Sequence, residues 1–141
     1  MPFKVLVYAH RKPGVSPEDF KKHYEAHIDL FKRLTGDDFP LSHRRIYIAR
    51  TSTETPSEGA SSRNATTPAN LIVGQQSDYD CDCLAELTFS DQAGWEACVA
   101  KVRSPEIGAQ IAADEDKFYD RSKTGVLVIG DVTETTKGDS A

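Results

Sequence analysis

Residues 13–36 read PGVSPEDFKKHYEAHIDLFKRLTG, and this stretch predicts one long amphipathic helix with defined ends. Ser16 is placed as the N-cap, Pro17 suits the first helical position, and Asp19 stands in a capping-box position. Gly36 is the predicted stop. The apolar stripe at helical spacing contains a histidine, and it consists of Phe20, Tyr24, His27, Ile28, Phe31 and Leu34.

Strands are predicted on both sides of this helix. Residues 3–10 (FKVLVYAH) read as a central strand, and residues 43–51 (HRRIYIART), 79–89 (YDCDCLAELTF) and 124–132 (TGVLVIGDV) follow. After the third strand, a helix is expected from Ser90 or Asp91 to about Arg103, and another begins at the Ser-Pro-Glu sequence of residues 104–106.

The element order is therefore β-α-β, insertion, β-α-(α)-β, which predicts an α+β, ferredoxin-like βαββαβ fold. Its antiparallel four-stranded sheet would carry the helices on one face. The other face is too apolar to remain in water, so we expect a homodimer that packs two sheets together. The residues expected on that face are Leu6, Tyr8, Tyr47, Leu84 and Leu127, or their alternates.

Composition narrows the function classes. The chain has 141 residues, a formal charge of −5 and a pI near 5.3, which argues against nucleic-acid binding. It has no run of about 18 apolar residues and no visible secretory signal, so we expect neither a membrane span nor export. Three cysteines indicate free thiols in a reducing, cytoplasmic compartment, and their spacing does not favour a metal site.

Two segments have little to bury. Residues 51–70, TSTETPSEGASSRNATTPAN, are rich in Ser, Thr, Pro, Gly and Ala and predict a long mobile loop, either disordered or a lid. The domain is expected to span residues 1–132, with a polar insertion at 51–78 and a polar tail at 133–141.

Two blocks of the sequence, one with Arg11, Lys12, Gly14 and Ser16 and one with AELTF, SPE and DEDKFYDRS, resemble the EthD domain family of dimeric α+β barrels. The first is VYAHRKPGVSPEDFKKHYEAHIDLFKRL, with its strand, its R-K-x-G-x-S pattern and its later aromatic, histidine and leucine. The second comprises AELTF, SPE and DEDKFYDRS ahead of the last strand. The matching positions are Arg11, Lys12, Gly14, Ser16, Phe20, Tyr24, His27, Leu30, Ala85, Glu86, Leu87, Phe89, Ser104, Pro105, Glu106, Asp116, Phe118, Asp120, Arg121 and Ser122.

This resemblance implies a dimeric barrel with a small, mostly apolar pocket between helices and sheet. Relatives of this kind act on aromatic polyketides and small ring compounds without a metal or organic cofactor. The resemblance thus implies a lyase or isomerase, such as a dehydratase, decarboxylase or cyclase, acting on an aromatic or poly-β-keto compound in polyketide tailoring of a fungal type. A cofactor-free anthrone oxygenase and a non-enzymatic small-molecule-binding barrel are the alternatives.

His27 is the leading catalytic candidate, because it lies on the buried stripe and an imidazole can transfer a proton near neutral pH. The alternative is a core histidine bonded to backbone. Tyr47 and Tyr8 could hold a ketone or phenolate oxygen in the same cavity, or could face a dimer partner. Glu86, in mid-strand, must be paired or functional; it could pair with Arg45 or Arg121, or orient His27.

The expected substrate-binding set is completed by residues near both ends of the chain. Tyr24 and Phe31 share the helical stripe with His27. His43 opens the second strand and could lie at the pocket mouth or be an exposed strand-end histidine. Asp120 precedes the last strand, where it reads mainly as a structural clamp with Arg121 and secondarily as a substrate anchor.

Overall fold

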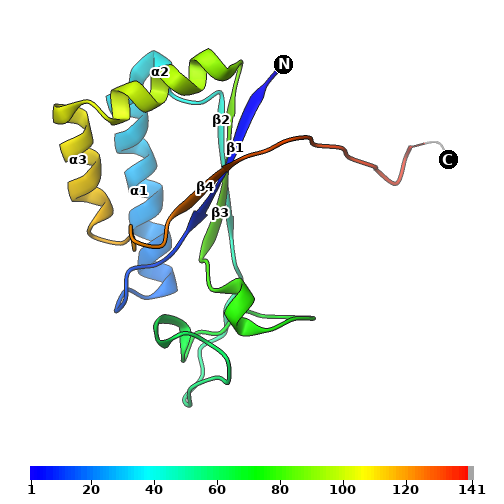
Figure 1. Cartoon of the computed structure of the whole chain (residues 1–141). Coiled ribbons are helices and arrows are strands. Elements are labelled where there is room, and N and C mark those ends of the chain that lie inside the picture. The colour runs from blue at the N-terminus through cyan, green and yellow to red at the C-terminus, as the bar shows by residue number, and fades with distance from the viewer. Residues whose placement is uncertain (140–141) are drawn as a thin grey trace.

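A computed structural model describes residues 1–139, and its helices all lie on one face of a single sheet (Figure 1). The strands are β1 (Phe3–Ala9), β2 (Ser42–Tyr47), β3 (Cys83–Phe89) and β4 (Gly125–Val128), and the helices are α1 (Pro17–Thr35), α2 (Gln92–Val102) and α3 (Pro105–Glu115). Within residues 1–139, no helix combines the length and apolarity needed to cross a bilayer.

Helix α1 begins and ends where its sequence predicts. The Ser16 hydroxyl accepts a hydrogen bond from the Asp19 backbone N–H at 3.1 Å, and Pro17 occupies the first turn. At the other end Gly36 has φ of 56°, a conformation that favours glycine, and its N–H donates to the Lys32 carbonyl. Between these ends, the apolar stripe of Phe20, Tyr24 and Ile28 turns His27 toward the sheet.

The strand order is β2-β3-β1-β4, with every neighbour antiparallel. This order confirms the predicted α+β, ferredoxin-like fold. Strands β2, β3 and β4 are shorter than predicted. The third strand is predicted to begin at Tyr79, but Tyr79 ends a 3-10 turn and the strand begins at Cys83. The chain leaves the sheet after Tyr47 to enter the insertion.

Alternate residues of the central strands face the helices and form the core. One cluster surrounds Phe20, Tyr24 and Phe118, and a second lies around Val5, Ala85 and Phe89. The three cysteines are free thiols, two of them buried in these clusters.

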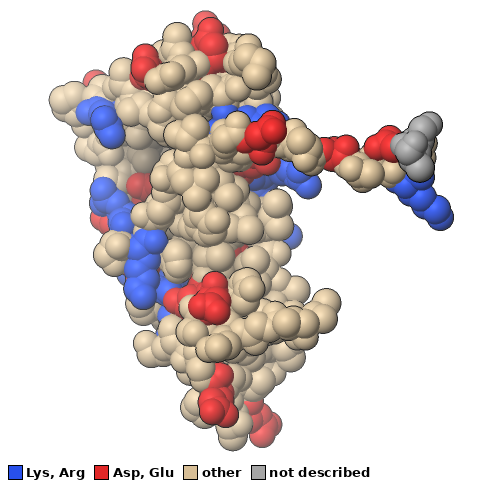
Figure 2. All heavy atoms as spheres, turned by 45° about the vertical axis from the view of Figure 1, so that its right-hand side comes forward, with Lys and Arg blue, Asp and Glu red and all other residues tan. Residues whose placement is uncertain are grey.

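The other face of the sheet has no covering layer within residues 1–139. Leu6 pairs with Leu127, and Ile46 pairs with Leu84, so these four apolar side chains share that face. We call it the open face. Figure 2 brings this side of the molecule forward and shows few charged side chains between the C-terminal tail and the insertion.

Tyr47 is an exception to the expected open face. It pairs with Cys83, which is buried beneath the helices, and its ring lies 6.4 Å from that of Phe20. The prediction that Tyr47 lies on the dimer-facing side is therefore wrong, because the parity of β2 turns its odd-numbered residues toward the helices.

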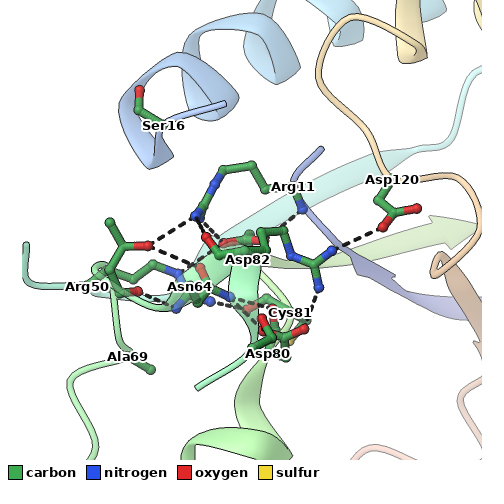
Figure 3. A network of polar contacts seen from close by, with 12 residues as sticks. Arg11, Ser16, Arg50, Asn64, Ala69, Asp80, Cys81, Asp82 and Asp120 are labelled. Atoms are coloured by element: carbon green, nitrogen blue, oxygen red, sulfur yellow. Dashed lines mark hydrogen bonds and ion pairs between the residues drawn. The ribbon is translucent and has the colours of Figure 1, made fainter. Parts of the chain in front are cut away.

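The insertion is attached to the domain by buried polar side chains (Figure 3). The Arg11 guanidinium meets the Asp82 carboxylate at 2.7 Å, donates to the Arg63 carbonyl at 2.8 Å, and both side chains of the ion pair are at most 3% exposed. Asn64 is buried and donates to Asp80. The expectation that this segment has almost nothing to bury is wrong, since it buries polar groups in place of apolar ones.

The predicted tail, 133–141, runs away from the domain as far as it is described, and residues 140–141 lie outside the described residues (Figure 1).

Candidate functional site

A cavity of about 370 Å³ lies between the three helices and the sheet. It is lined by members of both core clusters, so it occupies the space between them. Its volume falls in the range of about 300–1,000 Å³ that is typical of small-molecule sites. Most of its wall is apolar, formed by Val7, Ile28, Phe31, Leu87, Trp95, Cys98, Val99, Val102, Ile111 and Val126.

His27 lines this cavity from α1 and is held by a carboxylate on α3. Its Nδ1 lies 2.7 Å from Oδ2 of Asp114, and the His27 side chain is only 6% exposed. Burial opposes ionisation of Asp114, but its bond to His27 and the charges of His27 and Lys117 lower the pKa of this carboxyl below its usual value. The carboxylate therefore accepts the Nδ1 proton, so that when His27 carries one proton its lone pair lies on Nε2.

His43 lines the same cavity from the start of β2, and the expectation of an exposed strand-end histidine is wrong. Burial and then the charge of Arg45 lower the pKa of His43 to about 4. Arg45 Nη1 lies 3.2 Å from Nδ1 of His43, and a guanidinium can only donate, so Nδ1 accepts. His43 is thus a neutral imidazole at pH 7 that carries its proton on Nε2. Arg45 is itself positioned by two hydrogen bonds to Glu25, at 2.6 and 2.9 Å.

The partly buried His43 predicts a pH dependence of stability. Because the unfolded chain protonates His43 near pH 6.5 and the folded chain does so only near 4, the free energy of unfolding should fall as pH drops through that interval, by about 3 kcal/mol from this group. That contribution is fully present above pH 6.5. Urea unfolding of the protein and of His43→Gln at pH 7, 5.5 and 4.5 checks it. The variant should show the shallower slope, and equal slopes would contradict the assignment.

Two phenols and a second carboxyl complete the polar part of the cavity. Tyr24 and Tyr119 are both buried, with ring centroids 5.7 Å apart, and burial raises the pKa of each, so both are neutral hydroxyls. Glu115 also lines the cavity, and burial raises its pKa. Tyr24 stands between the two histidines, with ring centroids 6.4 Å from His27 and 6.3 Å from His43. The cavity therefore combines one oriented imidazole, that of His27, with neutral donors from His43, Tyr24 and Tyr119.

The structure brings four of the predicted site residues to this cavity: His27, Tyr24, Phe31 and His43. Tyr47 is excluded from it, since its hydroxyl donates to Glu25 at 2.6 Å and its ring borders a separate pocket of about 210 Å³ beside the insertion. Asp120 is also elsewhere and pairs with Arg63 at 3.1 Å (Figure 3), which fits the clamp interpretation with a different arginine.

Tyr8 and Glu86 lie on the open face. Tyr8 is opposite Leu84, and Glu86 is opposite Leu6, on the side of the sheet away from the helices. Glu86 approaches Lys4 at 3.8 Å, so the expected pairing with Arg45 or Arg121 is wrong. Glu86 cannot orient His27 because the sheet separates them, and Asp114 holds that place.

Sequence reasoning did not identify Asp114, which bonds to His27, or Glu115 and Tyr119, which line the cavity. All three belong to the block DEDKFYDRS, residues 114–122. A usable signal was the Asp114-Glu115 pair at the end of a helix that otherwise presents Ile107 and Ile111 to the core. In residues 1–139, no three His, Cys, Asp or Glu side chains are grouped so as to hold a metal ion.

Comparisons with known proteins place this geometry in a family. The profile of the EthD domain matches residues 12–122. The chain is similar to an ethyl tert-butyl ether D (EthD) family protein from Bacillus halodurans C-125, with a TM-score of 0.54 and 14% identity over 94% of this chain and 100% of that one. It is also similar to a protein of Arabidopsis thaliana, with a TM-score of 0.51 and 18% identity over 95% and 99% of the two chains. At these identities the likeness shows a shared fold alone. No curated protein matches this sequence.

Proposed function

Because this chain belongs to the EthD domain family, we propose that its cavity binds an aromatic or poly-β-keto small molecule and catalyses proton transfer at an activated carbon without a cofactor. The observation that carries the proposal is the bond between His27 and Asp114 at the wall of an apolar cavity. An apolar cavity with one oriented imidazole suits the removal of a weakly acidic C–H proton next to a carbonyl.

The mechanism assigns one role to each polar group. His27 Nε2 accepts the proton from carbon, and Asp114 positions the ring and stabilises the imidazolium that forms. Neutral His43, through Nε2–H, and the hydroxyls of Tyr24 and Tyr119 are the available donors to the developing enolate oxygen. A neutral imidazole can take this electrophilic role because its Nε2–H donates a hydrogen bond to the oxygen without transferring the proton.

The enolate or phenolate formed in this way is common to several overall reactions. Loss of water, loss of carbon dioxide, ring closure and isomerisation can all proceed from it, which corresponds to a lyase or isomerase in polyketide tailoring. If the same carbanion reacted with dioxygen, the protein would be an oxygenase. Dioxygen consumption during turnover distinguishes that outcome from the proposed one.

The test is proton exchange at C10 of anthrone, an aromatic ketone with an activated methylene group. NMR in D₂O measures how fast the protein accelerates loss of the C10 proton signal over buffer and over heat-unfolded protein. Acceleration under nitrogen supports acid–base chemistry. If anthrone binds and C10 exchanges at the buffer rate, the proposed function is wrong, and a binding protein becomes the better description.

We also propose that the protein is a homodimer that covers the open face, in line with its apolar character. Leu127 is 44% exposed on the edge strand β4 of that face, beside Leu6 of β1. Leu127→Arg should therefore convert a dimer to a monomer at micromolar concentration, since it would bury two unpaired charges at a two-fold interface.

Light scattering coupled to size exclusion measures this effect. Ile72→Arg is the matched control, because Ile72 is 99% exposed on the insertion and does not belong to the sheet. A wild-type monomer, or a dimer that survives Leu127→Arg, would contradict the proposed interface.

A further inference from the structure

Arg103 lies at the rim of the cavity that contains His27. It follows the last residue of α2 and caps that helix in the short turn before α3 begins at Pro105. Arg103 is exposed to solvent, yet it lines the cavity together with Val102 and Ile111. A residue that is both exposed and cavity-lining stands at the opening, so a ligand entering from solvent passes it.

The guanidinium of Arg103 has no carboxylate partner among residues 1–139 within 4.0 Å. The neighbouring basic side chains are already engaged. Lys101 donates to the Thr35 carbonyl at 2.9 Å and approaches Asp38 at 3.2 Å, and Arg121 approaches Asp116 at 3.4 Å. Arg103 is thus the cation at this cavity whose donors remain available to a ligand.

The inside of the cavity does not offset this positive charge. Its carboxyl group, that of Glu115, already faces the guanidinium of Arg121, with Oε1 lying 3.8 Å from Nε. Asp114 is occupied by His27 and Lys117. Apolar walls with a basic rim favour a molecule that has an aromatic body and one anionic group at its end.

We propose that Arg103 selects anionic substrates, holding a carboxylate or similar group at the rim while the aromatic body enters between α2 and the sheet and reaches His27. Selection by Arg103 rests on the proposed function, because it requires that this cavity receive the substrate. Arginine is suited to the task because its planar fork can donate two parallel hydrogen bonds to one carboxylate or sulfonate.

Two probe dyes of similar shape separate charge from apolar binding. 8-Anilinonaphthalene-1-sulfonate is an anion, and N-phenyl-1-naphthylamine is its uncharged counterpart. Trp95 is the single tryptophan of the chain and lines the cavity, so quenching of its fluorescence reports dye bound at this site. Titrations compare the wild type with Arg103→Met, Arg103→Lys and Arg33→Met. Arg33 is an exposed residue of the last turn of α1 and does not line the cavity, so its variant is a control for net charge.

The expected result is that Arg103→Met weakens binding of the sulfonate about fivefold and leaves binding of the uncharged dye unchanged. Arg103→Lys should retain part of the preference, and Arg33→Met should retain all of it. Equal weakening of both dyes by Arg103→Met, or sulfonate binding that stays at the wild-type level, would overturn the proposal. Failure of the proposed function is seen separately, as anthrone exchange at the buffer rate while the charge preference of the dyes persists.

Discussion

Replacement of His27 by alanine is expected to slow C10 proton exchange of anthrone by about 10²–10⁴-fold, the range typical for loss of a general base. The reason is that Nε2 of His27 is the acceptor, and no other imidazole in the cavity is prepared for that role. His43 has its Nδ1 lone pair occupied by Arg45 at 3.2 Å and carries the proton on Nε2. The loss should appear in the rate constant for exchange rather than in the affinity for the ligand.

Three further variants make this prediction specific. His27→Gln retains a hydrogen-bond donor for Asp114 and should fold, so it separates loss of the base from loss of folding. Its exchange rate should be as low as that of the alanine variant. Asp114→Asn should slow exchange by about 10–100-fold, because it removes the carboxylate that fixes the ring. His23→Ala changes an exposed histidine of the same helix and should have no effect. Full exchange activity in folded His27→Gln would exclude His27 as the base.

Replacement of Asp82 by alanine is expected to lower the free energy of unfolding by about 3–5 kcal/mol. Asp82 accepts hydrogen bonds from the backbone N–H and the guanidinium of Arg11, both at 2.7 Å, and Arg50 Nε lies 3.0 Å from it. All three side chains are at most 3% exposed. Without Asp82, two buried guanidinium groups would lose their countercharge.

Urea unfolding measures the loss, and Glu86→Ala provides the comparison. The Glu86 pair with Lys4 is longer, at 3.8 Å, and partly exposed, so its removal should change stability by less than about 1 kcal/mol. Arg11 also bonds to the Arg63 carbonyl and to Thr67 Oγ1, so Asp82→Ala should also speed tryptic cleavage after Arg63. An Asp82→Ala protein as stable as the wild type would contradict the view that this network anchors the insertion.

The ends of α1 and the strand order could be predicted from sequence because they depend on local signals. Ser16, Pro17 and Gly36 act within one turn of the helix, and the alternation of short apolar segments restricts the topology. The position of His27 on the buried stripe followed from helical spacing alone.

The partners of these elements could not be predicted in the same way. Asp114 meets His27 across 87 positions of sequence, and which face of α3 is turned toward α1 depends on packing. Ile46 and Tyr47 are neighbours on one strand and point to opposite faces of the sheet. Both are large side chains that suit either face, so the alternation alone did not show which of them faces the helices. The insertion reads as a mobile loop because burial of Arg63 and Asn64 depends on Asp80 and Asp120, which come later in the chain.

The most direct test of the proposed site is a crystal structure with anthraquinone, a planar and unreactive relative of anthrone. The carbon that corresponds to the reacting C10 position should lie about 3.5 Å from Nε2 of His27, with Nδ1 still bonded to Asp114. A ligand seated beside Tyr47 and the insertion, or a His27 ring turned away from the cavity, would contradict the proposed mechanism.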